Sequence, residues 1–237
     1  MQALLFDLDG TLIDSMPHHH DAWVEWHARR GLVMDAGGFF AATAGRSNAE
    51  IMLDLFPSKT VQEHIAMADE KEAIYRSLAA RSLALIEGAQ AFVQQARACG
   101  FRLAICTAAT VPNMTLAFER FGLDGWVDTV VSPADRASGP GPGARLRGKP
   151  HPDIFLEAAK RLNVAPGHCL VFEDAPLGVE AARRAGMKAV ALTTTLPADA
   201  FAGFDNLIAI APDFTSLDLP KLIRAIESAH QKAPHDA

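Results

Sequence analysis

Six acidic, hydroxyl and basic residues lie in separate segments of the sequence. Each follows an expected strand or precedes an expected helix in the pattern of apolar residues. They are Asp7, Asp9, Thr107, Lys149, Glu173 and Asp174. Two pairs of carboxylates gathered at one place repel each other strongly unless a cation lies between them. Oxygen-only ligands favour a hard cation, and Mg²⁺ is the common one where phosphate is bound. We therefore expect a Mg²⁺ site formed by Asp7, Asp9, Glu173 and Asp174.

The same residue types suit the transfer of a phosphoryl group. A carboxylate such as Asp7 can attack phosphorus and form an aspartyl-phosphate. Asp9, two residues later, can protonate the leaving oxygen and afterwards activate water. The hydroxyl of Thr107 and the ammonium of Lys149 can bind the transferring oxygens and neutralise developing charge. We interpret these four residues as catalytic.

Buried parallel strands are the elements expected to position these side chains. The apolar run Ala3-Leu4-Leu5-Phe6 ends directly before Asp7 and is typical of such a strand. Because helical patterns lie between most of the apolar runs, the sequence predicts an α/β fold, a Rossmann-like doubly wound parallel sheet covered on both sides. Ligands of such sheets bind beyond the carboxyl ends of the strands. The further expected strands are 102–106, 127–131, 169–172, 189–192 and 207–210, and the expected helices include 88–98, 152–162 and 176–185.

One region interrupts this alternation. From about Ser15 to Leu83 the sequence shows helical patterns, at 18–30, 49–56 and 61–80, and no convincing strand. This pattern predicts an inserted helical cap domain, 16–83, in an α/β core formed by 1–15 and 84–237. Two linkers, near residues 14–16 and 82–88, allow the cap to open and close over the site by hinge motion. A glycine- and proline-rich stretch, 138–148, is expected to be an exposed, mobile loop.

Composition argues against several other classes of protein. The chain has 237 residues and a net charge of −6, so nothing indicates the basic face that nucleic acid requires. No apolar run approaches the roughly 20 residues needed to span a bilayer, and the apolar start is too short for a signal peptide. The three cysteines lack metal-site spacing and are expected to be free thiols in a reducing cytoplasm.

The motifs around the chemistry-bearing residues resemble the four motifs of the haloacid dehalogenase superfamily. Each motif alone is a weak signal, but four in the right order are strong. The resemblance spans residues 3 to about 195 and implies a cytoplasmic, commonly monomeric, Mg²⁺-dependent enzyme acting on a small phosphorylated metabolite. The motifs are Phe6-Asp7-Leu8-Asp9-Gly10-Thr11, then Thr107 after Leu103-Ala104-Ile105-Cys106, then Gly148-Lys149-Pro150, and finally Glu173-Asp174 with the following residues to Ala182.

Within the superfamily the chain is most similar to the β-phosphoglucomutase-like branch, which has a helical cap after the first motif. The resemblance implies that substrate is bound by cap residues, namely His19, Trp23, Arg46, Asn48 and Lys71. His19 and Trp23 are four residues apart and therefore share one helix face. In the run His18-His19-His20, consecutive helix positions point in different directions, so only His19 is expected to face the site.

A phosphatase is the leading hypothesis, with a sugar phosphate as the favoured substrate and phosphoglycolate or a nucleotide monophosphate as alternatives. A phosphosugar mutase is favoured by His19 and Lys71. It is opposed by Asn48, which replaces an arginine that would clamp a distal phosphate. Dehalogenases and phosphonatases are disfavoured because the chain keeps Asp9. A non-enzymatic binding protein of this fold usually lacks a motif residue, and here none is missing.

Overall fold

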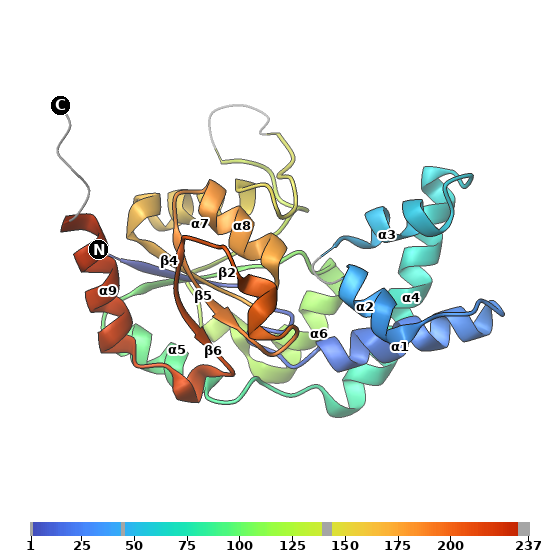
Figure 1. Cartoon of the computed structure of the whole chain (residues 1–237), viewed down its shortest axis with the longest axis horizontal. Coiled ribbons are helices and arrows are strands. Elements are labelled where there is room, and N and C mark those ends of the chain that lie inside the picture. Colours follow the sequence, from blue (N-terminus) through green and yellow to red (C-terminus); the bar gives the residue numbers. More distant parts are fainter. Residues whose placement is uncertain (1, 44–45, 139–143, 232–237) are drawn as a thin grey trace.

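A six-stranded parallel sheet forms the centre of the molecule (Figure 1). The computed structural model describes residues 2–43, 46–138 and 144–231. The strand order is β3-β2-β1-β4-β5-β6, so β1 lies in the middle and the order reverses on either side of it. This arrangement confirms the predicted doubly wound α/β sheet. The strands are β1 (Ala3–Phe6), β2 (Arg102–Cys106), β3 (Thr129–Val131), β4 (Cys169–Glu173), β5 (Lys188–Leu192) and β6 (Leu207–Ala211).

The register of the central strands decides which side chains emerge together. Phe6 of β1 is paired with Ile105 of β2 on one side and with Phe172 of β4 on the other. Neighbouring strands lie about 4.8 Å apart. The residues that follow these partners therefore leave the sheet side by side, at the edge where the sequence predicts the site.

Helices cover both faces of the sheet and bury two hydrophobic cores. One core involves α5 (Ala89–Ala98), α6 (Val111–Phe121) and α9 (Leu219–Gln231), and the other involves α7 (Asp153–Leu162) and α8 (Pro176–Arg184). All four residues of β1 are buried, because alternate side chains of this strand enter opposite cores. Within the described chain, no helix is both long and apolar enough to cross a membrane.

Between β1 and β2, the helices that precede α5 form a block beside the sheet (Figure 1). They are α1 (Met16–Arg29), α2 (Ala36–Thr43), α3 (Asn48–Leu55) and α4 (Val61–Ser82). Capping boxes open α3, at Ser47, and α4, at Thr60. The sequence analysis missed α2, whose residues include two glycines and two phenylalanines of low helix propensity. We call residues 16–83 the cap segment; its behaviour as a separate domain stays a prediction.

The two ends of the cap segment lie next to each other. Ile13 and Leu85 form an antiparallel bridge. The amide of Asp14 donates to the carbonyl of Ala84 at 2.9 Å. The chain therefore enters and leaves the helical block through one hydrogen-bonded pair of segments.

The glycine- and proline-rich stretch is anchored on both sides. Residues 139–143 lie outside the described part of the chain. Before them, the amide of Ser138 donates to Glu157 at 3.0 Å. After them, Leu146 is buried, and Arg147 forms an ion pair with Asp153 at 2.9 Å. Lys149, two residues after Arg147, is consequently held close to the sheet.

Candidate active site

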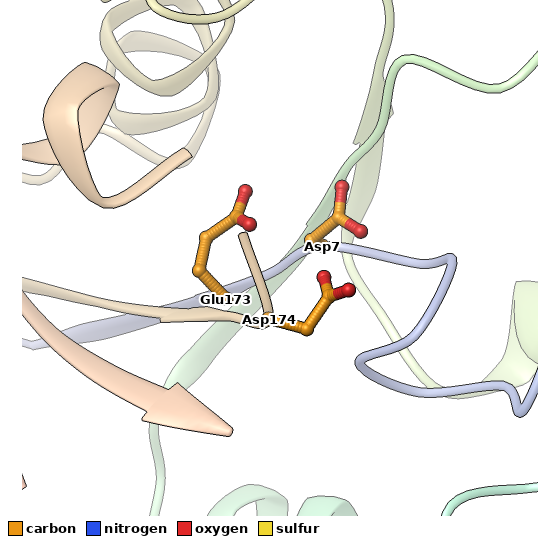
Figure 2. Close-up of side chains that lie close together, drawn as sticks. All are labelled: Asp7, Glu173 and Asp174. Carbon is orange, nitrogen blue, oxygen red and sulfur yellow. The ribbon is translucent and has the colours of Figure 1, made fainter. Parts of the chain in front are cut away.

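Three carboxylates converge at the carboxyl edge of the central strands. Asp7 follows β1, Glu173 ends β4 and Asp174 follows it, and one oxygen from each lies within 4.8 Å of the others. Figure 2 shows the three side chains lying close together. All three residues are buried. Burial first, and then repulsion by neighbouring carboxylates, raise the pKa of each of these groups.

Lys149 completes this cluster. Its ammonium group contacts the carboxylate of Asp7 and lies 2.5 Å from that of Glu173. Burial alone would lower the pKa of Lys149, but the two carboxylates raise it above the ordinary value. The lysine is therefore held in its charged form, close to the nucleophile that the sequence predicts.

The donor set of this edge fits a divalent cation. Three carboxylates against one ammonium leave two negative charges uncompensated when all groups are ionised. Oxygen donors of this kind select hard ions such as Mg²⁺. Asp7, Glu173 and Asp174 are therefore the side chains able to hold the metal, which the sequence analysis expected together with Asp9.

The carboxylate of Asp9 is not part of the acidic cluster. The chain turns sharply here, because the amides of Thr11, Leu12 and Ile13 all donate to the carbonyl of Leu8. The turn directs Asp9 toward the cap segment, where its Oδ1 accepts a hydrogen bond of 2.7 Å from Ser15. This position suits proton transfer at the mouth of the site better than metal binding by the side chain.

Two glycines make room for the acidic cluster. A Cβ atom on Gly178 would lie 1.9 Å from the carboxyl carbon of Glu173. A Cβ atom on Gly10 would lie 2.2 Å from an oxygen of Asp174, and Gly10 has a φ of +75°, which favours glycine. Thr11 and Thr195 both donate hydrogen bonds to Asp174. The sequence analysis did not identify Gly178 or Thr195 as supports of the site.

A chain of polar contacts connects Asp9 to the cap segment. His19 Nε2 lies 3.7 Å from Asp9, and His19 Nδ1 lies 2.8 Å from the Lys71 ammonium. Since the lysine donates to Nδ1, the ring proton of His19 belongs on Nε2, facing Asp9. The ring of His19 stacks on Tyr75, with centroids 3.8 Å apart. These contacts fix the orientation of His19.

Glu72, which the sequence analysis missed, is the centre of the network on the cap side. Its carboxylate accepts hydrogen bonds from Asn48 and Asn113, both at 2.6 Å, and pairs with Lys71 at 2.9 Å. Burial raises the pKa of Glu72, but Lys71, His19 and the two amides outweigh it and lower the pKa to about 2. Burial lowers the pKa of Lys71, and Glu72 opposes that effect.

A cavity of about 300 Å³ lies between the sheet edge and the cap segment. All the catalytic, metal and cap residues predicted from the sequence line it: Asp7, Asp9, His19, Trp23, Arg46, Asn48, Lys71, Thr107, Lys149, Glu173 and Asp174. The structure thus brings the predicted residues to one place, while their roles stay predictions.

The remaining cap residues are held by local contacts. Arg46 forms an ion pair with Asp54 at 2.6 Å. Trp23 is buried against Trp26 and Phe39, so it packs within the cap as well as lining the cavity. His18 bonds to Ser82 and does not join His19 at the cavity.

Comparison with known proteins gives consistent results. A family model described as haloacid dehalogenase-like hydrolase matches residues 1–186. Validoxylamine A 7'-phosphate phosphatase of Streptomyces hygroscopicus subsp. limoneus is 34% identical over 225 residues, which cover 93% of this chain and 98% of that protein. Hexitol phosphatase A of Escherichia coli (strain K12) is 34% identical over 209 residues, covering 84% and 85%. A solved HAD hydrolase of family IA, variant 3, from Entamoeba histolytica has a TM-score of 0.84 and 26% identity, covering 96% of this chain and 100% of that one.

Proposed function

We propose that this chain, which belongs to the haloacid dehalogenase-like hydrolases, is a Mg²⁺-dependent phosphatase that hydrolyses a small phosphomonoester of the sugar-phosphate class. The observation that carries the proposal is the convergence of Asp7, Glu173 and Asp174 with Lys149 at one sheet edge. Asp9 faces the same cavity. This arrangement offers a nucleophile, a metal site, a cation for phosphate and a proton carrier.

The roles follow from the position of each group. The carboxylate of Asp7 attacks phosphorus and forms an aspartyl-phosphate, while Asp9 gives a proton to the leaving oxygen. In the second step Asp9 takes a proton from water, which attacks the acyl phosphate and frees Asp7. Lys149 and Thr107 bind the oxygens of the transferring group. Mg²⁺ held by Asp7, Glu173 and Asp174 would supply charge neutralisation between nucleophile and phosphate.

The named relatives support a phosphorylated sugar or polyol as substrate. Two of them, at 34% identity, bear the names of phosphatases for validoxylamine A 7'-phosphate and for hexitol phosphates. A mutase would need a group that binds a second phosphate. At the position expected for it, Asn48 donates its amide to Glu72. This contact favours the phosphatase over the mutase.

We also propose that residues 1–15 and 84–237 act as the core and residues 16–83 as a hinged cap. Support comes from the paired linkers at Asp14 and Ala84 and from the cavity between the two parts. Arg76 of α4 also donates to Asn113 of α6 at 3.0 Å, which connects the cap segment to the core.

A phosphomonoester panel tests the proposed function. Release of inorganic phosphate from at least one sugar or polyol phosphate, dependent on Mg²⁺ and abolished by chelation, is the expected result. Products are separated chromatographically to detect any isomerised sugar phosphate. Folded protein that is silent across the panel contradicts the proposal, and isomerisation without net phosphate release assigns a mutase instead.

A further inference from the structure

The cavity has two ends of different chemistry. One is the sheet edge that carries Asp7, Lys149, Glu173 and Asp174, which we call the catalytic edge, and the other is bounded by the cap segment. We call it the cap end, and it is lined mostly by hydroxyl, amide and aromatic groups. Thr110, which directly precedes α6 of the core, also lines the cavity, and its hydroxyl is buried without a hydrogen-bond partner. Such groups suit a ligand that carries hydroxyls on an apolar frame. The lining residues of this end include Phe40, Thr43, Ser47, Asn48 and Asn113, of which Asn113 reaches it through Glu72.

The cations of the cap end are already paired with carboxylates of the chain. Lys71 pairs with Glu72, and both residues are at most 4% exposed. Arg46 pairs with Asp54. Lys71 and Arg46 are the only lysine and arginine among the described residues that line this end of the cavity. An anionic group placed here would lose its hydration without gaining a free positive partner.

The carboxylate of Glu72 offsets the positive charge of Lys71 at the same place. Its depressed pKa of about 2 keeps the carboxylate ionised at any working pH. Its two oxygens already receive the amides of Asn48 and Asn113, so those amides do not offer their donors to an anion. A neutral hydroxyl can instead donate to Glu72.

We propose that Glu72 is a specificity-determining residue that restricts the enzyme to monophosphates whose far end is uncharged and rich in hydroxyls. Substrates with a second phosphate or a carboxylate at that end are rejected. This inference rests on the proposed function, because it assigns the phosphate to the catalytic edge and the rest of the substrate to the cap end. Of the substrates that the sequence analysis left open, it excludes bisphosphates and phosphoglycolate.

Matched substrates test the proposal directly. Initial rates are compared for fructose 1-phosphate and fructose 1,6-bisphosphate, for glucose 6-phosphate and glucose 1,6-bisphosphate, and for phosphoglycolate. Juxtaposed like charges cost several kilocalories per mole. In the sugar pair that the wild type turns over faster, its kcat/KM is therefore expected to be ~100-fold or more higher for the monophosphate than for the bisphosphate. Equal turnover of a monophosphate and its bisphosphate overturns the inference while leaving the phosphatase in place.

Two substitutions locate the selectivity. Glu72→Gln is expected to reduce the ratio of kcat/KM for the monophosphate to kcat/KM for the bisphosphate by about 10-fold. The change should come mainly from a lower KM for the bisphosphate, because the like charge of the carboxylate is gone. Asn48→Arg adds a cation beside the same carboxylate and is expected to narrow the preference as well. Glu70→Gln is the matched control: it lies on the same helix, pairs with Arg30 at the surface and does not line the cavity.

Thermal unfolding shows whether each variant is folded. If Glu72→Gln fails to fold, Asn48→Arg carries the comparison. An unchanged preference in both folded variants overturns the assignment to Glu72.

A binding measurement separates this inference from the proposed function. The Asp9→Asn protein with Mg²⁺ is titrated calorimetrically with the same sugar phosphates. Tighter binding of the monophosphate by ~100-fold supports the inference even if the wild type turns over nothing, in which case only the proposed function fails. Equal affinities for monophosphate and bisphosphate overturn the inference about Glu72, even if the protein is an active phosphatase.

Discussion

The two sides of the cavity are built in different ways. The catalytic edge is fixed by backbone pairing, because Asp7 directly follows β1 and Glu173 ends the adjacent β4, and the sheet sets the register of the two strands. The cap end is fixed by side chains that reach between helices, as when Asn113 of α6 and Asn48 of α3 meet at Glu72 of α4. Backbone register tolerates little change, whereas a side-chain network can be altered one residue at a time. The sheet edge is therefore the more rigid side of the cavity, and the cap end is the more adaptable one.

The largest expected effect is at the catalytic edge. Asp7→Asn removes the nucleophile, and kcat is expected to fall by roughly 10⁴-fold or more while the protein remains folded. His19→Ala, which acts on the cap side through Asp9, is expected to lower kcat by only about 10–100-fold. Steady-state kinetics on the best panel substrate measure both. Equal losses in the two variants would break the contrast between the two sides.

Crowding the acidic cluster should have the next largest effect. In Gly178→Ala the new Cβ would overlap the carboxylate of Glu173, so we expect weaker Mg²⁺ activation and a loss of about 1–3 kcal/mol in the free energy of unfolding. The control is Gly125→Ala, where a Cβ meets nothing within 4 Å. Urea unfolding and Mg²⁺ titration measure the two effects. If the two variants have the same free energy of unfolding and the same Mg²⁺ activation, the side chain of Glu173 has room to move.

Mg²⁺ should stabilise the folded protein more at higher pH. The pKa values of Asp7, Glu173 and Asp174 are raised on folding, chiefly by burial. Their contribution to stability is therefore complete below their unfolded pKa values and is lost as pH rises through the folded ones. Mg²⁺ binds the ionised carboxylates and restores that loss, by about 2.7 kcal/mol at 100 times its Kd.

Differential scanning calorimetry at pH 6 and pH 8, with and without Mg²⁺, measures this effect. The expected result is a larger rise of Tm at pH 8 than at pH 6, with Ca²⁺ as a comparison for ion size. A rise that is independent of pH would mean that the three carboxylates are not the ligands.

The smallest expected effect is on the cap side. Arg46→Ala removes a guanidinium that is paired with Asp54, a partly exposed contact worth at most about 1 kcal/mol. KM for the preferred monophosphate is expected to change less than about threefold. A rise of KM by a factor near one hundred would show that Arg46 leaves Asp54 to bind substrate, and would sharpen the view of how adaptable the cap end is.

The sequence was most informative where function depends on local order along the chain. Apolar runs followed by Asp7, Thr107 and Glu173 predicted the strands, the sheet edge and the residues that meet there. Residues that matter through distant contacts left no such pattern. Glu72 becomes central only because Asn113, far along the chain on α6, reaches it. Thr195 likewise supports Asp174 across a separate strand and loop.

Two predictions were limited by the kind of signal used. Helix α2 was missed because glycine and aromatic residues in a short segment give little helical preference, and packing against α1 and the cap core supplies the rest. Spacing alone did not show that the turn after Leu8 directs the side chain of Asp9 toward the cap segment, and its place among the metal ligands stays a prediction. Spacing predicted which residues line one cavity, but not the direction in which each side chain points.

The paired linkers of the cap segment have a consequence for how such a protein can diversify. The chain leaves the sheet side at Asp14 and returns beside it at Ala84. The whole intervening segment is therefore a loop whose two ends are held together. The entropy of closing a loop rises only slowly with its length. A segment of different size or sequence could therefore be spliced between these two points without shifting the strands. Recombination at this junction would give new substrate ranges to an unchanged reaction centre.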